Sequence, residues 1–236
     1  MVFQPVVDLA TGATVGHEAL ARFADGRTPN LWFEDADRAG LGVELDLLAI
    51  GTALRVLPED VPGYLAVNVG PATLASPRLR EMLQLTDGRR RLVLELTERQ
   101  AVAEFALTAV GIAQMRNAGI LVALDDVGGG SVALRQLVEL GPDIVKIDRS
   151  LISHIDQDQS GRAQAAAFTQ LALGLGWTVM AVGIERHEEV SACHAMGILY
   201  GQGYLLGRPA PLSGPGVSSA SSWIALSEEI WQAGQG

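Results

Sequence analysis

Acidic and amide side chains recur along this chain where short apolar runs end. The clearest case is LVALDDVGGG at 121–130, in which Asp125 and Asp126 stand between an apolar run and three glycines. Aspartate and glycine are common turn residues, so a turn explains this stretch when it is taken alone. Adjacent carboxylates also suit a pair of divalent cations, which prefer oxygen ligands. The choice depends on whether other runs end in the same way.

Other apolar runs do end in polar residues. Each such residue has a plain explanation by itself, for example a surface charge or a turn. Their recurrence is not explained in this way, because surface residues would fall without regard to the strand register. The metal interpretation of the double aspartate is therefore favoured. The polar residues at or near the ends of the runs are Glu18, Asn68, Glu95, Asp125, Asp126, Lys146, Asp148, Glu185 and Gln202.

The apolar runs are rich in Val, Ile and Leu and alternate with stretches of helical pattern, which is typical of repeated βα units. No Gly-x-Gly-x-x-Gly turn follows the early strands, so the alternation favours a (β/α)8-type barrel over an open doubly wound sheet. The expected strands are 3–7, 14–19, 65–69, 92–96, 120–124, 144–147, 178–182 and 204–206. The expected helices are 33–56 (as two helices), 72–85, 104–118, 132–140, 161–175 and 188–196.

Composition narrows the class of protein. The 236 residues fit one large domain, and a hydrophobic content of 48% with 19% charged residues is typical of a globular protein. The net charge of -10 argues against a nucleic-acid polymer as partner, but it allows a small phosphate ligand held by cations. The sequence contains neither a membrane span nor a secretory signal. The single cysteine, Cys193, excludes an internal disulfide and fits a reducing cytoplasm.

Eight motifs occur in a fixed order: FQPVVDLATG at 3–12, GHEALARF at 16–23, VNVGP at 67–71, LELTE at 94–98, LDDVGGG at 124–130, PDIVKIDRSLI at 142–152, VGIE at 182–185 and GQGYLLGRP at 201–209. Together they resemble the EAL domain family, the cyclic di-GMP phosphodiesterases of bacterial second-messenger signalling. The resemblance implies a modified TIM (β/α)8 barrel with one antiparallel strand. It covers residues 1–211 and leaves 212–236 as a linker and short helix.

The resemblance also implies a reaction. Active members hydrolyse cyclic di-GMP to linear pGpG, using water held between two divalent cations, Mg²⁺ or Mn²⁺. By match, Asp125 would bridge the two cations, Asp126 would bind the second, and Lys146 would orient or help activate the water. The residues matched to the first cation are Glu18, Asn68, Glu95 and Asp125.

Further residues match the ligand pocket and a loop. Arg22 suits a phosphate oxygen because its guanidinium offers a fork of donors. Glu98 matches the glutamate that steadies the loop after the double aspartate, a loop that the family uses in dimerisation, so a homodimer is one expectation. Sensory or GGDEF-type domains upstream are another, because the chain begins almost at the first motif. The residues matched to ligand contacts are Gln4, Leu20, Arg22, Asp148 and Gln202.

The chain departs from the family at one position that the resemblance links to catalysis. Active relatives read Ala-Glu-Gly-Val-Glu where this chain reads AVGIE at 181–185, so Val182 replaces a glutamate that supports the second cation and the catalytic water. Valine cannot coordinate a cation, and Glu185 would need a shifted backbone to substitute. The loop at 125–132 also lacks the family's aromatic and threonine residues, and Gly70 stands where serine is common. We therefore expect weakened, Mn²⁺-favoured hydrolysis, a weakened second cation site and weakened loop-mediated dimerisation.

Two pairs of alternatives stay open. The retained carboxylates favour an enzyme, since a scaffold does not need so costly a cluster of like charges. Val182 favours a catalytically silent cyclic di-GMP receptor or a protein-binding regulator. Beyond the barrel, 213–222 reads as a Ser/Gly-rich linker and 223–232 as a helix with an apolar side. That helix either packs back on the barrel or binds a partner.

Overall fold

The computed structural model describes residues 1–56, 61, 63–84, 92–128 and 134–212. Within them, eight strands close into one barrel in chain order, as expected. β1 is antiparallel to both of its neighbours, whereas the other neighbouring strands are parallel. The strands are β1 (Val2–Asp8), β2 (Thr14–Leu20), β3 (Tyr64–Asn68), β4 (Leu92–Thr97), β5 (Leu121–Val127), β6 (Ile144–Ile147), β7 (Thr178–Val182) and β8 (Tyr200–Gln202).

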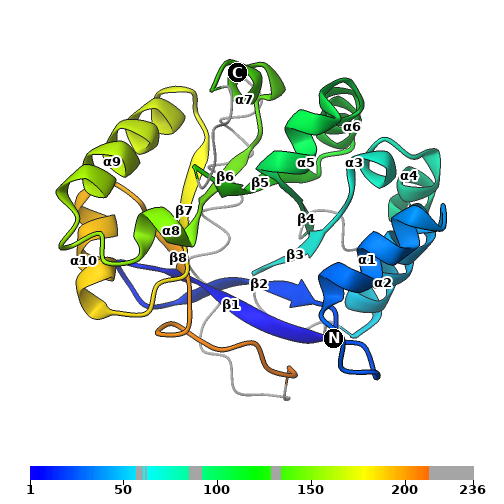
Figure 1. The fold of residues 1–236 in the computed structure, drawn as a ribbon, viewed down its shortest axis with the longest axis horizontal. Helices are drawn as coiled ribbons and strands as arrows, with labels where there is room; N and C mark the ends of the chain where they lie inside the picture. The colour runs from blue at the N-terminus through cyan, green and yellow to red at the C-terminus, as the bar shows by residue number, and fades with distance from the viewer. Residues whose placement is uncertain (57–60, 62, 85–91, 129–133, 213–236) are drawn as a thin grey trace.

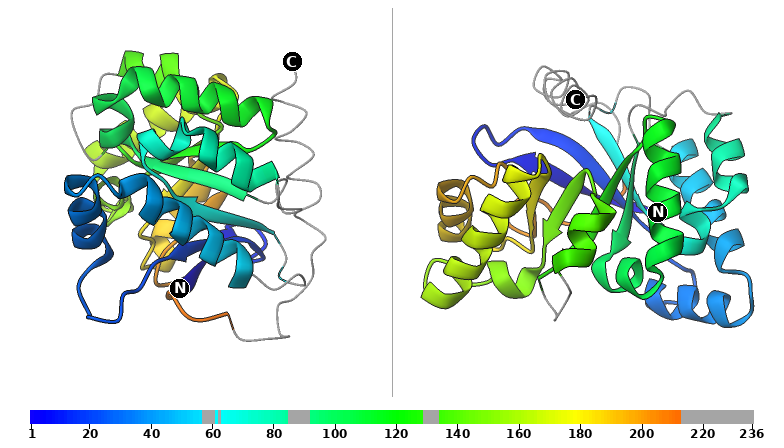
Figure 2. Two further views of the ribbon diagram at one scale, coloured as in Figure 1. Left: turned by 90° about the vertical axis from the view of Figure 1, so that its right-hand side faces the viewer. Right: turned by 90° about the horizontal axis from the view of Figure 1, so that it is seen from above.

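The helices lie on the outside of the barrel. Helices α1, α2 and α4 lie on one side and α9 and α10 on the opposite side, and two further views show the strands between them (Figures 1 and 2). None of the described helices is long and apolar enough to cross a membrane. The helices are α1 (Pro29–Arg38), α2 (Gly42–Val56), α3 (Pro71–Leu74), α4 (Pro77–Gln84), α5 (Glu98–Ala103), α6 (Phe105–Asn117), α7 (Leu134–Leu140), α8 (Arg149–Ile152), α9 (Gln159–Gly174) and α10 (His187–Ala195).

The prediction of the last strand was wrong. The apolar run at 204–206 forms a turn, in which the N–H groups of Leu206 and Gly207 donate to the carbonyl of Gly203. The N–H of Leu205 donates to the carbonyl of Ile184. Strand β8 lies just before this turn and ends at Gln202. A short apolar run is compatible with either a strand or a packed turn. The pattern of side chains does not reveal which carbonyl groups the backbone N–H groups bond.

The double aspartate lies within β5 and not after it. The register between β5 and β6 shifts between Leu124 and Val127, and Asp126 has a left-handed backbone with a φ of 57°. Such irregularities bend a strand and redirect a side chain, and they are common next to active sites. The two adjacent carboxylates therefore share one bulged strand end.

The strands carry two layers of side chains inside the barrel. The lower layer is apolar and includes Ala66, Val93, Ala123, Ile144 and Met180, which belong to one buried cluster. Because strand side chains alternate between the two faces, the residue two positions later on each strand faces the same interior. The larger apolar cluster contains the alternate residues of these strands together with buried helix residues. Apolar side chains thus fill the barrel at one level. The residues two positions later on these strands form the next level.

Gly63, just before β3, provides a test of the barrel packing. Its φ is +86°, and a Cβ at this position would overlap the backbone of Val15. We expect Gly63→Ala to lower the free energy of unfolding by about 3 kcal/mol, from backbone strain and overpacking together. Gly12→Ala is the matched control, because Gly12 has a φ of +73° with open space around it. It should cost only about 1 kcal/mol. Equal losses in urea denaturation would contradict this packing.

Candidate active site

A ring of eight side chains, one from each strand, occupies the level above the apolar layer. We call it the site ring. Seven of its members are polar or charged, and the eighth is Val182. In β3 to β7 each member follows a residue of the apolar layer by two positions, so the same alternation that builds the core builds the site. The members are Gln4, Glu18, Asn68, Glu95, Asp125, Lys146, Val182 and Gln202.

Lys146 lies at the centre of the ring. Its Nζ donates to Glu95 Oε2 at 2.7 Å, to Asp125 Oδ2 at 2.9 Å and to Glu18 Oε2 at 3.3 Å. The lysine is only 1% exposed. One buried ammonium thus joins carboxylates from three other strands, β2, β4 and β5.

The protonation of these groups follows from burial and charge. Burial alone would lower the pKa of Lys146, but the three carboxylates outweigh it and raise that pKa well above its ordinary value. Burial also acts to raise the pKa of Glu18, yet the charge of Lys146 and the bonds from Gln202 and Asn68 bring it below its ordinary value. Burial raises the pKa of Glu95, which Lys146 opposes. Lys146 therefore carries a positive charge and donates hydrogen bonds to the three carboxylates around it.

Two amides extend the cluster from Glu18 to the adjoining strands. Gln202 Nε2 donates to Glu18 Oε2 at 2.9 Å and to Gln4 Oε1 at 3.3 Å, and Gln4 Nε2 donates to the carbonyl of Gly207 at 3.0 Å. Asn68 Nδ2 donates to Glu18 Oε1 at 3.0 Å. Both oxygens of Glu18 are thus held in place, and the structure brings Gln4, Asn68 and Gln202 into the same network as the carboxylates.

The cluster has the chemistry of a cation site. Glu18, Glu95 and Asp125 each offer one oxygen, and these three oxygens lie within 4.8 Å of one another. The nitrogen of Asn68 is bonded to Glu18, which leaves its carbonyl oxygen as the ligand atom. Oxygen donors of this kind suit Mg²⁺ and Mn²⁺. The donor set fits a divalent cation.

Asp126 lies at the rim of this cluster. Its side chain is exposed, and its N–H donates to Asp125 Oδ1 at 2.8 Å. Burial, followed by the charges of Asp125 and Asp148, raises the pKa of Asp126 to about 6. A second positive charge would relieve this repulsion.

The other predicted ligand residues lie at the rim or outside it. Asp148 caps α8 by accepting from the N–H of Ser150 at 2.8 Å. Leu20 is partly buried at the end of β2. Arg22 is exposed, and its Nη1 donates to the carbonyl of Ala21. The structure therefore does not bring the Arg22 guanidinium into contact with the carboxylates.

A hydrogen bond of Glu98 links the start of α5 to the residue just after β5. Glu98 begins α5 and is buried, and its Oε2 accepts from the N–H of Gly128 at 3.1 Å. It therefore holds the chain just past the double aspartate. The triple glycine continues into residues 129–133, which lie outside the described residues, as do the linker and helix predicted after 212.

Val182 and Glu185 lie apart from each other. Val182 pairs with Gln202 across β7 and β8, on the side of β7 that Met180 occupies in the apolar layer. Glu185 is exposed, and its carboxylate bonds Arg149 at 2.9 Å. It thus pairs with the Arg149 guanidinium, outside the site ring.

The sequence reasoning missed one structural carboxylate near this strand. Glu189 is buried and accepts from the N–H groups of His154, Glu185 and Arg186 at 2.9, 2.9 and 3.1 Å. It stands at the third position of α10, where an acid commonly caps a helix start. That local pattern could have identified it, although its bond to His154 could not be foreseen.

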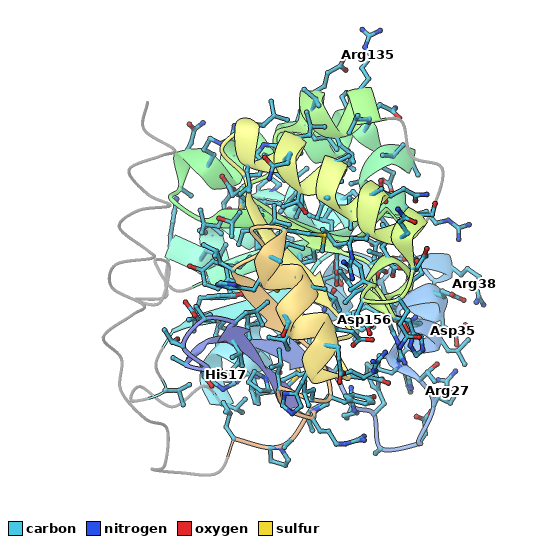
Figure 3. The ribbon with its side chains drawn as sticks, turned by 90° about the vertical axis from the view of Figure 1, so that its left-hand side faces the viewer. His17, Arg27, Asp35, Arg38, Arg135 and Asp156 are labelled. Carbon is cyan, nitrogen blue, oxygen red and sulfur yellow. The ribbon has the colours of Figure 1, made fainter. Side chains whose placement is uncertain are left out.

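Other ion pairs lie at the surface, unlike the buried pairs of Lys146. Arg27 and Arg38 both bond Asp35 at 2.8 Å on α1, and these three residues lie together at the surface while Arg135 extends away from α7 (Figure 3). Exposed pairs of this kind contribute about 0–1 kcal/mol to stability. The buried pairs of Lys146 are therefore the electrostatic feature on which the site depends.

Known proteins resemble this chain in both sequence and structure. PdeB of Escherichia coli, named a probable cyclic di-GMP phosphodiesterase, is 32% identical over 225 residues, which cover 89% of this chain and 42% of PdeB. The calcium and cyclic di-GMP complex of BlrP1 from Klebsiella pneumoniae has a TM-score of 0.79 at 29% identity, over 89% of this chain and 55% of that chain. The PaMucR phosphodiesterase in complex with cyclic di-GMP has a TM-score of 0.77 at 27% identity, over 89% and 91% of the two chains.

The chain spans less than half the length of the first curated relatives that it matches, 31% and 42% for the first two. The sequence profile of the EAL domain family matches residues 1–209, which is most of the chain. This chain belongs to the EAL domain family.

Proposed function

We propose that this barrel binds cyclic di-GMP and hydrolyses it weakly to linear pGpG with two divalent cations. The observation that carries the proposal is the convergence of Glu18, Glu95 and Asp125 on Lys146 at one end of the barrel. Relatives of this chain are named as cyclic di-GMP phosphodiesterases, and similar structures hold cyclic di-GMP together with calcium or manganese. We propose the cytoplasm as the compartment, because a lone thiol fits a reducing environment.

The cation ligands are those that the family resemblance implies, and the donor set around Glu18, Glu95 and Asp125 supports them. Glu18, Asn68, Glu95 and Asp125 would hold the first cation, and Asp125 and Asp126 the second, with Mg²⁺ or Mn²⁺ as the ions. Bound there, the cations would lower the pKa of water and offset the charge of the phosphate. The raised pKa of Asp126 gives it a tendency to keep its proton below about pH 6, so binding at the second position requires that proton to leave.

Lys146 acts through its charge. The three carboxylates around it raise its pKa, so without bound cations it carries a positive charge. As an ammonium it can orient the attacking water and limit the repulsion among the carboxylates. Of the two roles that the family resemblance implies, we propose orientation of the water, because three acceptors hold the ammonium in one place.

Ligand contacts complete the proposal. Gln4 and Gln202 are bonded to each other and to Glu18, so they shape the floor of the pocket. Asp148, at the start of α8, and Leu20, at the end of β2, would contact the ligand as the family resemblance implies. Arg22 is exposed, and among the described residues its guanidinium donates to the carbonyl of Ala21, so we expect it to turn toward a phosphate oxygen when the ligand binds.

Val182 weakens the chemistry more than the binding. It is the apolar member of the site ring, and the nearest alternative acid, Glu185, bonds Arg149. The first cation keeps all four of its ligands, whereas the second relies on the two aspartates. Loss of an outer-shell partner commonly costs about 10- to 100-fold in activity or metal affinity, and loss of an inner group should cost at least as much.

A second function is favoured by the same residue. A cyclic di-GMP receptor needs the pocket and the first cation but not the second, and Val182 removes only the latter. The domain would then sense the ligand, or regulate a protein partner, without turnover. Upstream sensory or GGDEF-type domains belong to either proposal, as does a homodimer through the loop that Glu98 steadies.

Restoring the missing carboxylate tests the function. We expect Val182→Glu to raise the rate of pGpG formation by about 10- to 100-fold in Mn²⁺, because a carboxylate returns to the second cation position. Product chromatography after incubation with cyclic di-GMP measures it. Val182→Gln is the matched control, with similar size and no charge, and should stay near the native rate. Glu18→Gln should abolish turnover.

The outcomes separate the two functions. A native protein as fast as Val182→Glu would show that the glutamate is dispensable. Turnover only in Val182→Glu would make the native domain a receptor. If neither protein makes pGpG and neither binds cyclic di-GMP, both functions fail.

A second test concerns Asp126 and needs no ligand. Its pKa is about 6 in the folded chain and ordinarily 3.8, so the folded state binds the proton more tightly and loses stability as pH rises through this window. With a chelator present, Asp126→Asn should raise Tm by about 1–2 °C near pH 7.5 and leave it unchanged near pH 3.5. Excess Mn²⁺ should reverse the order by stabilising the native protein more. A Tm difference independent of both pH and Mn²⁺ would refute this role.

A further inference from the structure

Asp46 is a buried carboxylate outside the site ring. It lies in α2 and is 7% exposed. Its Oδ2 accepts from the N–H of Gly70 at 2.8 Å and from the Thr73 hydroxyl at 2.6 Å. Burial raises the pKa of Asp46, which these two bonds oppose. Burying a carboxylate costs free energy unless hydrogen bonds compensate for it. The two donors to Asp46 therefore indicate what this residue does.

Those partners form the start of α3. Gly70 is the cap residue of this helix and provides no side-chain bond to it. Asp46 supplies the missing acceptor from another helix, 24 residues away in the chain. A Cβ at position 70 would lie 3.3 Å from Asp46 Oδ2, so the absence of a side chain there leaves room for the carboxylate. Gly70 thus leaves the space that the Asp46 carboxylate occupies.

The held segment continues directly from Asn68. Asn68 is the last residue of β3 and bonds Glu18 through its side chain at 3.0 Å. The N–H of Val69 donates to the carbonyl of Glu95 at 2.9 Å, and the next N–H, that of Gly70, donates to Asp46. Three consecutive residues are therefore fixed, and Asp46 provides the anchor on the helix side.

Two other strand exits are built in the same way. After β5, buried Glu98 accepts from the N–H of Gly128, and after β7, buried Glu189 accepts from the N–H groups of Glu185 and Arg186. In each case a carboxylate from a helix holds the backbone just past a strand of the site ring. Asp46 performs this task for β3, the strand that carries Asn68.

We propose that Asp46 is a positioning residue of the metal site, which fixes the exit of β3 so that Asn68 stays against Glu18 and presents its oxygen to the cation. This inference rests on the proposed function, since it requires the site to bind a divalent cation. It assigns the residue no contact with ligand or metal.

The test compares Mn²⁺ affinity among variants of the whole chain by calorimetry, with amide exchange at Gly70 as a second readout. Asp46→Ala should weaken Mn²⁺ binding by about 10- to 100-fold and speed the exchange, because the strand exit loses its anchor. Asp46→Asn should rescue both, since one amide oxygen can accept from both donors. Leu137→Ala, a buried change in α7, should lower Tm while Mn²⁺ affinity stays within about threefold.

Other outcomes overturn the inference in distinct ways. Native Mn²⁺ affinity in Asp46→Ala, or an equal loss in Leu137→Ala, would reduce Asp46 to a general stabiliser. If Asp46→Ala does not fold, Thr73→Val decides, because it removes one of the two bonds: weaker Mn²⁺ binding at unchanged Tm supports the inference, and unchanged binding overturns it. A native chain that binds no Mn²⁺ would overturn the proposed function and this inference with it.

Discussion

The structure depends on one buried ammonium. Lys146 is almost completely enclosed and bonds three carboxylates at 2.7–3.3 Å. Removing such a charge from water costs several kcal/mol, so the site exists only while its partners stay in place. Those partners come from β2, β4 and β5, whereas the lysine comes from β6, and only a closed sheet brings the four strands to one point. The site therefore depends on the closed arrangement of these strands.

The alternation of the strands explains how the barrel accommodates so many polar groups. One interior layer is apolar, and the next layer, two residues later in β3 to β7, forms the site ring. The stable part of the barrel and its reactive part are thus adjacent levels of the same strands. Val182 is the apolar member of the site ring, two residues after Met180 of the apolar layer. In the proposed function, valine at this position would leave one carboxylate fewer at the crowded end of the barrel, which would reduce repulsion at the expense of a cation ligand. This is why we propose that the domain keeps binding while its turnover is weakened.

Much of this arrangement could be predicted from the sequence, because both the strands and the polar residues at their ends follow local rules. The parts that could not be predicted depend on contacts between distant residues. The run at 204–206 reads as a strand, but its N–H groups are used by Gly203 and Ile184 in a turn. The double aspartate reads as a strand end, but a register shift places it inside β5. Asp46 carries no local signal at all, since its partners lie 24 and 27 residues further along the chain.

The central claim is that the first cation site is complete and the second is not. Anomalous diffraction from crystals grown with Mn²⁺ and cyclic di-GMP measures the occupancy of each position directly. The account predicts a strong peak held by Glu18, Asn68, Glu95 and Asp125, and a much weaker one at Asp126. Two peaks of equal strength would contradict it by showing that Val182 costs the second cation nothing, and the absence of any peak at the four ligands would show that the cluster around Lys146 is not a metal site.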